Sequence, residues 1–222
     1  MAPEAKIYLA DERGITETSW FRSCNTFNFG RYQHKHKTAA GNIYVLNDDT
    51  LAGSKSLAMT IEEPTHVLLL PVVGSVSYKD SNDNITTTAA GQLQYSLLGK
   101  RTAYTVTNPF KKELVNFLQV WIKAGNPAAA GCSQFIFDID KNKNTLVKTG
   151  PGSPAVYIGK FDGRQETVLP LQNKPAFVFV IQGAFEVQGV LLHSRDGLAL
   201  QNHPSIELEA LSNEAIIFII QG

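Results

Sequence analysis

The chain has 222 residues, enough for one large or two small domains, and 43% of them are hydrophobic, which suffices for buried cores. Its 20 lysine and arginine residues balance its 20 aspartate and glutamate residues. Because a neutral chain has no overall field that attracts nucleic acid or an anionic membrane, we expect no direct binding to either.

The cysteine content and the N-terminal sequence predict a cytoplasmic protein. The chain has only two cysteines, Cys24 and Cys132, whereas secreted chains of this kind more often carry several paired ones. Residues 1–13 contain no apolar stretch of the kind found in a signal peptide. The longest apolar run, near residues 67–73, is far shorter than the roughly 20 residues that a membrane helix needs.

Short β-rich runs, separated by glycine, asparagine, aspartate and proline, follow one another along the chain, and long helical patterns are nearly absent. Runs of this kind with regular turn signals predict an all-β fold built as sandwiches or barrels. In chain order, the predicted strands are 42–46, 66–73, 75–78, 92–96, 103–107, 114–122, 133–138, 155–160, 176–181, 185–187, 206–210 and 215–220.

A weak internal repeat divides the chain into two parts. In the first half, an apolar strand ends at Gly74 and an alternating strand follows it. The same order recurs around Gly183 in the second half. Between the two lies the segment 123–131, which is rich in small and structure-breaking residues and is typical of a linker. We therefore predict two modules, residues 1–124 and residues 125–222.

Several short motifs follow one another in the first half of the chain. They are Asp11-Glu12-Arg13-Gly14, Phe27-Asn28-Phe29-Gly30-Arg31-Tyr32, Val45-Leu46-Asn47-Asp48-Asp49, Gly74, Tyr78-Lys79-Asp80-Ser81, Asn84, Gly91, Gln94, Gly99, Asn108-Pro109 and Leu118-Gln119-Val120-Trp121-Ile122. They resemble the motifs of the pirin family, whose members are bicupins and in some cases oxidise quercetin. The resemblance covers residues 7–123 well and the second half in pattern only. It implies two cupin modules, which are β-barrels of the jelly-roll type with few short helices.

The resemblance also implies where a metal ion would bind. Family members that carry a metal hold it with a His-x-His motif early in the first cupin and a His-x-Glu motif later. Such a set suits a divalent transition metal with open positions for substrate. Counts back from Gly74 and forward from Gly91 place the four positions at Thr60, Glu62, Tyr104 and Val106. All three histidines are absent and Val106 cannot coordinate a metal, so we expect a metal-free pocket lined by these four residues and no cofactor.

The function expected from this pattern is that of a non-catalytic, pirin-like protein that binds a small organic ligand or a protein partner. One alternative is an oxidoreductase similar to quercetin 2,3-dioxygenase with an atypical metal site formed by Glu62, His66 and Tyr104. Against it, Pro64 interrupts the strand on which Glu62 and His66 would have to share one face. His66 is also a secondary candidate for lining the pocket.

A second alternative is a redox or stress sensor that acts through a cysteine. Cys24 lies close to Arg22, and a neighbouring cation favours the reactive thiolate form of a cysteine. Cys132 is the other candidate for this role.

Overall fold

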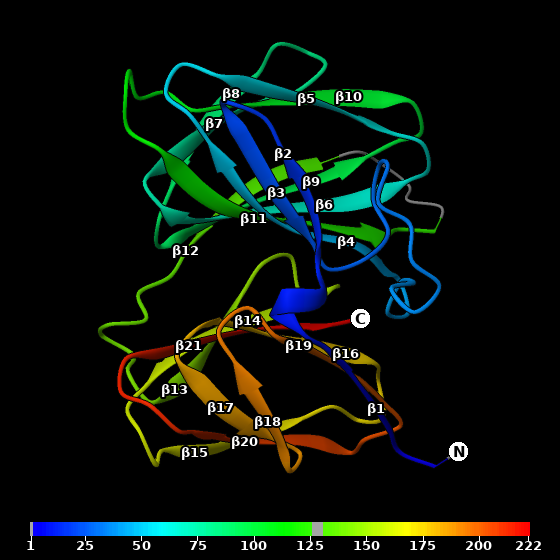
Figure 1. The fold of residues 1–222 in the computed structure, drawn as a ribbon, viewed down its shortest axis with the longest axis vertical. Helices are drawn as coiled ribbons and strands as arrows, with labels where there is room; N and C mark the ends of the chain where they lie inside the picture. Colours follow the sequence, from blue (N-terminus) through cyan, green and yellow to red (C-terminus); the bar gives the residue numbers. More distant parts are fainter. Residues whose placement is uncertain (1, 126–130) are drawn as a thin grey trace. The chain divides into compact units, whose positions relative to one another are not determined.

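The computed structural model describes residues 2–125 and 131–222, which form two compact units (Figure 1). The N-terminal unit is Gly14–Ile136. The C-terminal unit combines the chain up to Arg13 with Phe137–Gly222. Nearly every regular element is a β-strand, and the described residues contain no helix long and apolar enough to cross a membrane.

The N-terminal unit is a double sheet. Its larger sheet has the strand order β12-β9-β6-β11-β4-β3-β2, and its smaller sheet has the order β5-β10-β7-β8. The strands are β2 (Gly14–Glu17), β3 (Phe21–Asn25), β4 (Ile43–Leu51), β5 (Ser56–Ile61), β6 (Thr65–Val73), β7 (Ser75–Lys79), β8 (Ile85–Ala89), β9 (Gln92–Leu98), β10 (Thr102–Thr107), β11 (Val115–Lys123) and β12 (Gly131–Ile136).

The C-terminal unit is a second double sheet. Its larger sheet has the order β1-β19-β16-β21-β14-β13, and its smaller sheet has the order β15-β20-β17-β18. A short 3-10 helix, η1 (Ala10–Glu12), follows the first strand. The strands are β1 (Glu4–Tyr8), β13 (Thr145–Thr149), β14 (Ala155–Phe161), β15 (Glu166–Pro170), β16 (Ala176–Gln182), β17 (Ala184–Val187), β18 (Val190–His193), β19 (Gly197–Gln201), β20 (Ser205–Ala210) and β21 (Ala215–Gln221).

The two units repeat one topology. The order β9-β6-β11-β4-β3 in the first corresponds to β19-β16-β21-β14-β13 in the second, and β5-β10-β7-β8 corresponds to β15-β20-β17-β18. The expected repeat lies at the same point of both units. Gly74 joins β6 to β7 with φ +79°, and Gly183 joins β16 to β17 with φ +80°. Because L-residues with side chains rarely adopt this φ, glycine is the residue that permits the sharp change of direction at both junctions.

The boundary between the units differs from the predicted modules 1–124 and 125–222. The strand β12 lies beyond residue 125 but pairs with β9 of the N-terminal unit, whereas β1 pairs with β19 of the C-terminal unit. These two strands, which we call the arm strands, each cover an edge strand whose backbone groups would otherwise lack partners. The composition of β1 and β12 does not show that they pair with strands so far away in the sequence. Of the predicted linker 123–131, residues 126–130 lie outside the described residues.

A buried carboxyl group fixes the N-terminal arm in the C-terminal unit. One oxygen of Asp196 accepts a hydrogen bond from the backbone N–H of Ala10 at 2.7 Å, and the other accepts one from the backbone N–H of His193 at 2.8 Å. Asp196 is itself buried. Both contacts bond a charged acceptor to the main chain, so the arm is an integral part of this unit.

The two barrels differ in what fills them. The core cluster of the C-terminal barrel consists of apolar side chains such as Phe161, Phe185 and Leu192. The N-terminal barrel also has an apolar cluster, which includes Ile61 and Phe117, but its buried residues include several asparagine, glutamine and aspartate side chains as well. Buried polar groups cost free energy unless they are paired, so the N-terminal barrel is the better candidate for a binding site.

Candidate functional site

The alternation of side chains along β5 and β10 decides which residues reach the interior of the N-terminal barrel. On β10, Tyr104 and Val106 are buried members of the core cluster. On the paired strand β5, Met59 lies directly opposite Tyr104, and Leu57 lies opposite Val106. Ile61 follows on the same face and is completely buried. The β5 side of this interior is therefore apolar.

Thr60 and Glu62 do not join Tyr104 and Val106, so the expected pocket of four residues is not formed as a set. Thr60 is exposed on the opposite face of β5, and Glu62 is exposed just beyond the end of that strand. The count back from Gly74 runs across the loop that joins β5 to β6, and the two-residue period of a strand does not continue through a loop. Ile61, which lies between Thr60 and Glu62 in the chain, is the residue that is buried there.

Hydrogen bonds hold the Tyr104 side chain in one position. Its hydroxyl donates to Gln119 Oε1 at 2.7 Å and accepts from Trp121 Nε1 at 2.8 Å. The Tyr104 ring also lies against Tyr78, with ring centroids 5.5 Å apart. Burial raises the pKa of Tyr104 well above its ordinary value. The phenol is therefore neutral, and its donor and one acceptor position are already occupied.

Five buried polar side chains, which we call the polar array, extend across the larger sheet beside Tyr104. Each is at most 2% exposed. Their strands place them as neighbours, with Asn47 between Asn25 and Gln119 in one row and Ser23 opposite Asp49 in the next. The polar array consists of Ser23, Asn25, Asn47, Asp49 and Gln119.

Several atoms of the polar array make no hydrogen bond within the described structure. They include Asn25 Oδ1, both side-chain atoms of Asn47 and Gln119 Nε2. Burial raises the pKa of Asp49 to about 7, the Ser23 hydroxyl partly offsets this increase, and the Asp48 charge adds to it. A carboxyl group with a shifted pKa beside unpaired amides is a pattern typical of binding sites, and the sequence signal for it was the polar residues at alternate positions of β3 and β4.

The residues present do not fit the transition-metal site that the family resemblance implies. Val106 has no donor atom, and the Tyr104 hydroxyl is committed to neutral partners. Among the residues that the structure describes, no group of three or more histidine, cysteine, aspartate or glutamate side chains is placed to hold a metal ion.

The atypical metal site expected from Glu62, His66 and Tyr104 is not assembled either. His66 alternates with Val67, which belongs to the barrel core, so it faces away from the interior that holds Tyr104. Its Nδ1 forms a hydrogen bond with the Tyr95 hydroxyl at 2.9 Å, and burial lowers its pKa. These contacts give His66 a structural role and exclude it from the pocket for which it was a candidate.

The two cysteines lie far apart in the larger sheet of the N-terminal unit. Cys132 is exposed on β12, and its Sγ accepts a hydrogen bond from Gln94 Nε2 at 2.9 Å. Cys24 is half-buried on β3, opposite Asp48. Both are free, and five inter-strand spacings, about 24 Å measured along the curved sheet, separate β12 from β3. A redox role for either cysteine stays a prediction.

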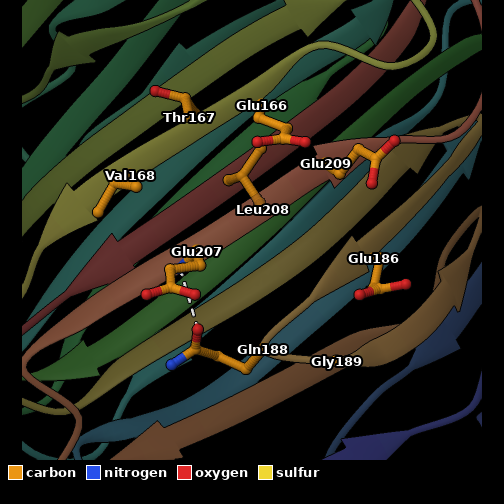
Figure 2. Close-up of a pocket in the computed structure, with 9 residues that line it drawn as sticks. All are labelled: Glu166, Thr167, Val168, Glu186, Gln188, Gly189, Glu207, Leu208 and Glu209. Carbon is orange, nitrogen blue, oxygen red and sulfur yellow. Dashed lines mark hydrogen bonds between the residues drawn. The ribbon is translucent and has the colours of Figure 1, made fainter.

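A concave feature lies on the C-terminal unit, where an acidic groove of about 240 Å³ runs over β15, β20 and β17 (Figure 2). Glu209 lies directly opposite both Glu166 and Glu186 on its two neighbouring strands. This row could not be predicted from the sequence, because its members are about 20 residues apart and each occupies an ordinary polar position of a strand. The groove is lined by Glu166, Thr167, Val168, Glu186, Gln188, Gly189, Glu207, Leu208 and Glu209.

Replacing Glu209 by glutamine is expected to stabilise the C-terminal unit by roughly 0.2–1 kcal/mol, because like charges directly opposite each other across strands repel. Urea unfolding at low salt measures the gain, which should shrink at high salt as the charges are screened. Glu207→Gln is the matched control, since Glu207 lies opposite Val168. Equal gains for both variants would contradict the role of the row.

Two copies of one double-sheet barrel in a single chain define a bicupin. Residues 154–219 match the family described as the quercetinase C-terminal cupin domain. The chain is 24% identical over 228 residues to quercetin 2,3-dioxygenase of Escherichia coli (strain K12), a match that covers 95% of this chain and 96% of that protein. These matches confirm the resemblance to the pirin family that the motifs of the first half indicated.

Solved structures show the same fold. The crystal structure of YhhW from Escherichia coli aligns with a TM-score of 0.86 at 20% identity and covers 99% of this chain and 98% of that one. A structure described as bacterial pirin YhhW in complex with nickel(II) aligns with a TM-score of 0.84 at 20% identity and covers 98% of both chains. The all-β bicupin architecture expected from the sequence is confirmed.

Proposed function

We propose that this chain is a pirin-like protein that works without the transition-metal site of its family and binds a small ligand in the N-terminal barrel without chemically converting it. The observation that carries the proposal is the state of Tyr104, whose hydroxyl is held between Gln119 and Trp121 at one of the expected ligand positions. A tyrosine hydroxyl held by two neutral partners, beside the wholly apolar Val106, supports binding without a transition metal.

The contrast between the barrels supports binding in the N-terminal one. Binding sites combine apolar walls with a few convergent polar groups, and the polar array beside Tyr104 and Trp121 supplies such groups. The core cluster of the C-terminal barrel is apolar and offers packing alone. A ligand that bonds to polar atoms would therefore be held in the first barrel.

The competing proposal is an oxidoreductase of the quercetin 2,3-dioxygenase type, which the names of the relatives favour. Oxidation of a flavonol by that route needs a metal ion to bind the substrate and handle oxygen. The positions of Glu62 and His66, outside the interior, weigh against an alternative set of ligands.

Metal loading and turnover separate the two proposals. The purified protein is incubated with nickel, iron, manganese or cobalt, desalted, and analysed by elemental mass spectrometry and by the loss of quercetin absorbance. The Escherichia coli quercetin 2,3-dioxygenase is the positive control. We expect far less than one metal ion per chain and no turnover. One retained ion per chain, with turnover that Tyr104→Phe abolishes, would establish the enzyme instead.

Quercetin also serves as a binding probe, because Trp121 lies beside Tyr104 and the chain has only 2 tryptophans. In a Trp20→Phe background, Trp121 is the remaining tryptophan and reports on the interior. Saturable quenching of its fluorescence without turnover is the expected result. Quenching that rises linearly with quercetin, as for random collisions, would contradict a binding site in this barrel.

A further inference from the structure

We infer that part of the polar array, formed by Ser23, Asn25, Asn47 and Asp49, is a site for a small monovalent cation, which takes the place of the proton on the Asp49 carboxyl group. The candidate ligands are oxygen atoms on two paired strands, β3 and β4. This site uses none of the positions that the family resemblance assigns to a transition metal, so it does not rest on the proposed function.

The strand register brings the oxygen atoms together. Asn25 lies directly opposite Asn47, and Ser23 lies directly opposite Asp49. Side chains in such pairs have Cβ atoms about 4.5–5.5 Å apart, and residues two apart on a strand share one face. All four side chains therefore meet on a single patch of the barrel interior, and each is at most 2% exposed.

The hydrogen bonds within this patch leave some of its side-chain oxygen atoms without a donor. Asn25 Nδ2 donates to Ser23 Oγ at 2.9 Å, which fixes the orientation of the amide and leaves its Oδ1 without a donor. Asn47 Oδ1 likewise has no hydrogen-bond partner among the described residues. Nearby, the Gln119 oxygen already accepts from Tyr104, so Gln119 offers its Nε2 donor to the patch and is not a ligand.

A buried carboxylate needs a counter-charge, and the described residues around Asp49 supply none. The groups that face it are Ser23 from β3, Phe117 from β11 and, more distantly, the neutral Tyr104 from β10, while the charge of Asp48 next to it in the chain is repulsive. Buried charges in proteins are paired or coordinate a metal ion. The carboxyl group therefore binds either a proton or a cation, and its pKa of about 7 lets the two compete near neutral pH.

The ligand chemistry indicates the class of cation. Carboxylate, amide and hydroxyl oxygens suit hard cations, and the patch has no imidazole or thiolate ligand for a transition metal. A single carboxylate neutralises one positive charge, whereas a dication would leave a buried charge uncompensated. The fitting ligands are sodium, potassium and ammonium ions, which share this charge and bind oxygen.

Thermal unfolding at pH 8.5 tests the site. The midpoint temperature is measured in sodium, potassium and ammonium chloride and in tetramethylammonium chloride, whose cation is too bulky to enter, all at equal ionic strength. We expect a higher midpoint in at least one small-cation salt, which rises with the concentration of that salt and identifies the ion. At pH 5, where the proton occupies Asp49, the difference should vanish.

Two variants assign the effect to this patch. Asp49→Asn should abolish the difference between salts, and Asp48→Asn, one residue away on the opposite face of β4, should retain it. Asn25→Ala should weaken it while the circular dichroism spectrum stays that of the folded protein. Equal midpoints for the wild type in all four salts, or a difference that survives Asp49→Asn, would overturn the inference, and neither result bears on the transition-metal experiment.

Discussion

Replacing Asp49 by asparagine is expected to stabilise the N-terminal unit at alkaline pH by up to about 4 kcal/mol, measured in tetramethylammonium buffer. The side chain is completely buried, and its burial raises the pKa to about 7 from an ordinary value of 3.8. Asparagine has nearly the same shape and carries no charge. The variant therefore removes the cost of burying a carboxylate while it keeps the packing.

The direction of the pH dependence follows from the raised pKa of Asp49. Below about pH 4 the carboxyl is protonated in both the folded and the unfolded chain, so it costs nothing. As the pH rises toward 7, the unfolded chain loses its proton first, and the folded state becomes progressively less stable relative to it. Above pH 7 both states are ionised and the full cost remains. The advantage of Asp49→Asn should thus appear between pH 4 and 7 and then stay constant.

Urea unfolding of the wild type and of Asp49→Asn, repeated across this pH range, measures the difference in the free energy of unfolding. Asp48→Asn is the control, because it changes the net charge by the same amount from the opposite face of β4. A difference between Asp49→Asn and the wild type that is independent of pH would show that the carboxyl group is not titrating inside the barrel.

Much of the fold could be predicted because it depends on local patterns. Apolar runs near residues 66–73 and 176–181 predicted strands, and the structure has β6 and β16 there. The glycines at positions 74 and 183 marked the equivalent turns of the two barrels. Alternation and turn chemistry are properties of neighbouring residues, so a single sequence carries them.

Other features depend on pairing between distant segments, and these could not be predicted. Neither arm strand, β1 or β12, differs in composition from a strand of its own module, so only the observed pairing assigns it. The count back from Gly74 ran across the loop between β5 and β6 and put Thr60 and Glu62 in the interior, but both side chains are exposed. The count forward from Gly91 put Tyr104 and Val106 there, and both are buried.

Ile61→Ala tests whether Ile61, and not Thr60 or Glu62, faces the barrel interior. It is expected to destabilise the N-terminal unit by about 2–5 kcal/mol. The side chain is completely buried in the apolar cluster of the barrel, opposite Thr102 on β10. Its truncation removes apolar contacts and leaves a cavity that the surrounding strands fill only in part. Its two neighbours in the chain, Thr60 and Glu62, are exposed, so Thr60→Ala and Glu62→Ala should each change stability by less than about 0.5 kcal/mol.

The three variants are compared by urea unfolding, with tryptophan fluorescence as the signal because Trp121 belongs to the same apolar cluster as Ile61. A large loss for Ile61→Ala with small changes on either side would confirm that this part of β5 presents Ile61 to the interior. The reverse pattern would restore Thr60 and Glu62 to the barrel and with them the four-residue pocket. In that event the two side chains would again be candidate metal ligands, although Val106 would still lack a donor atom.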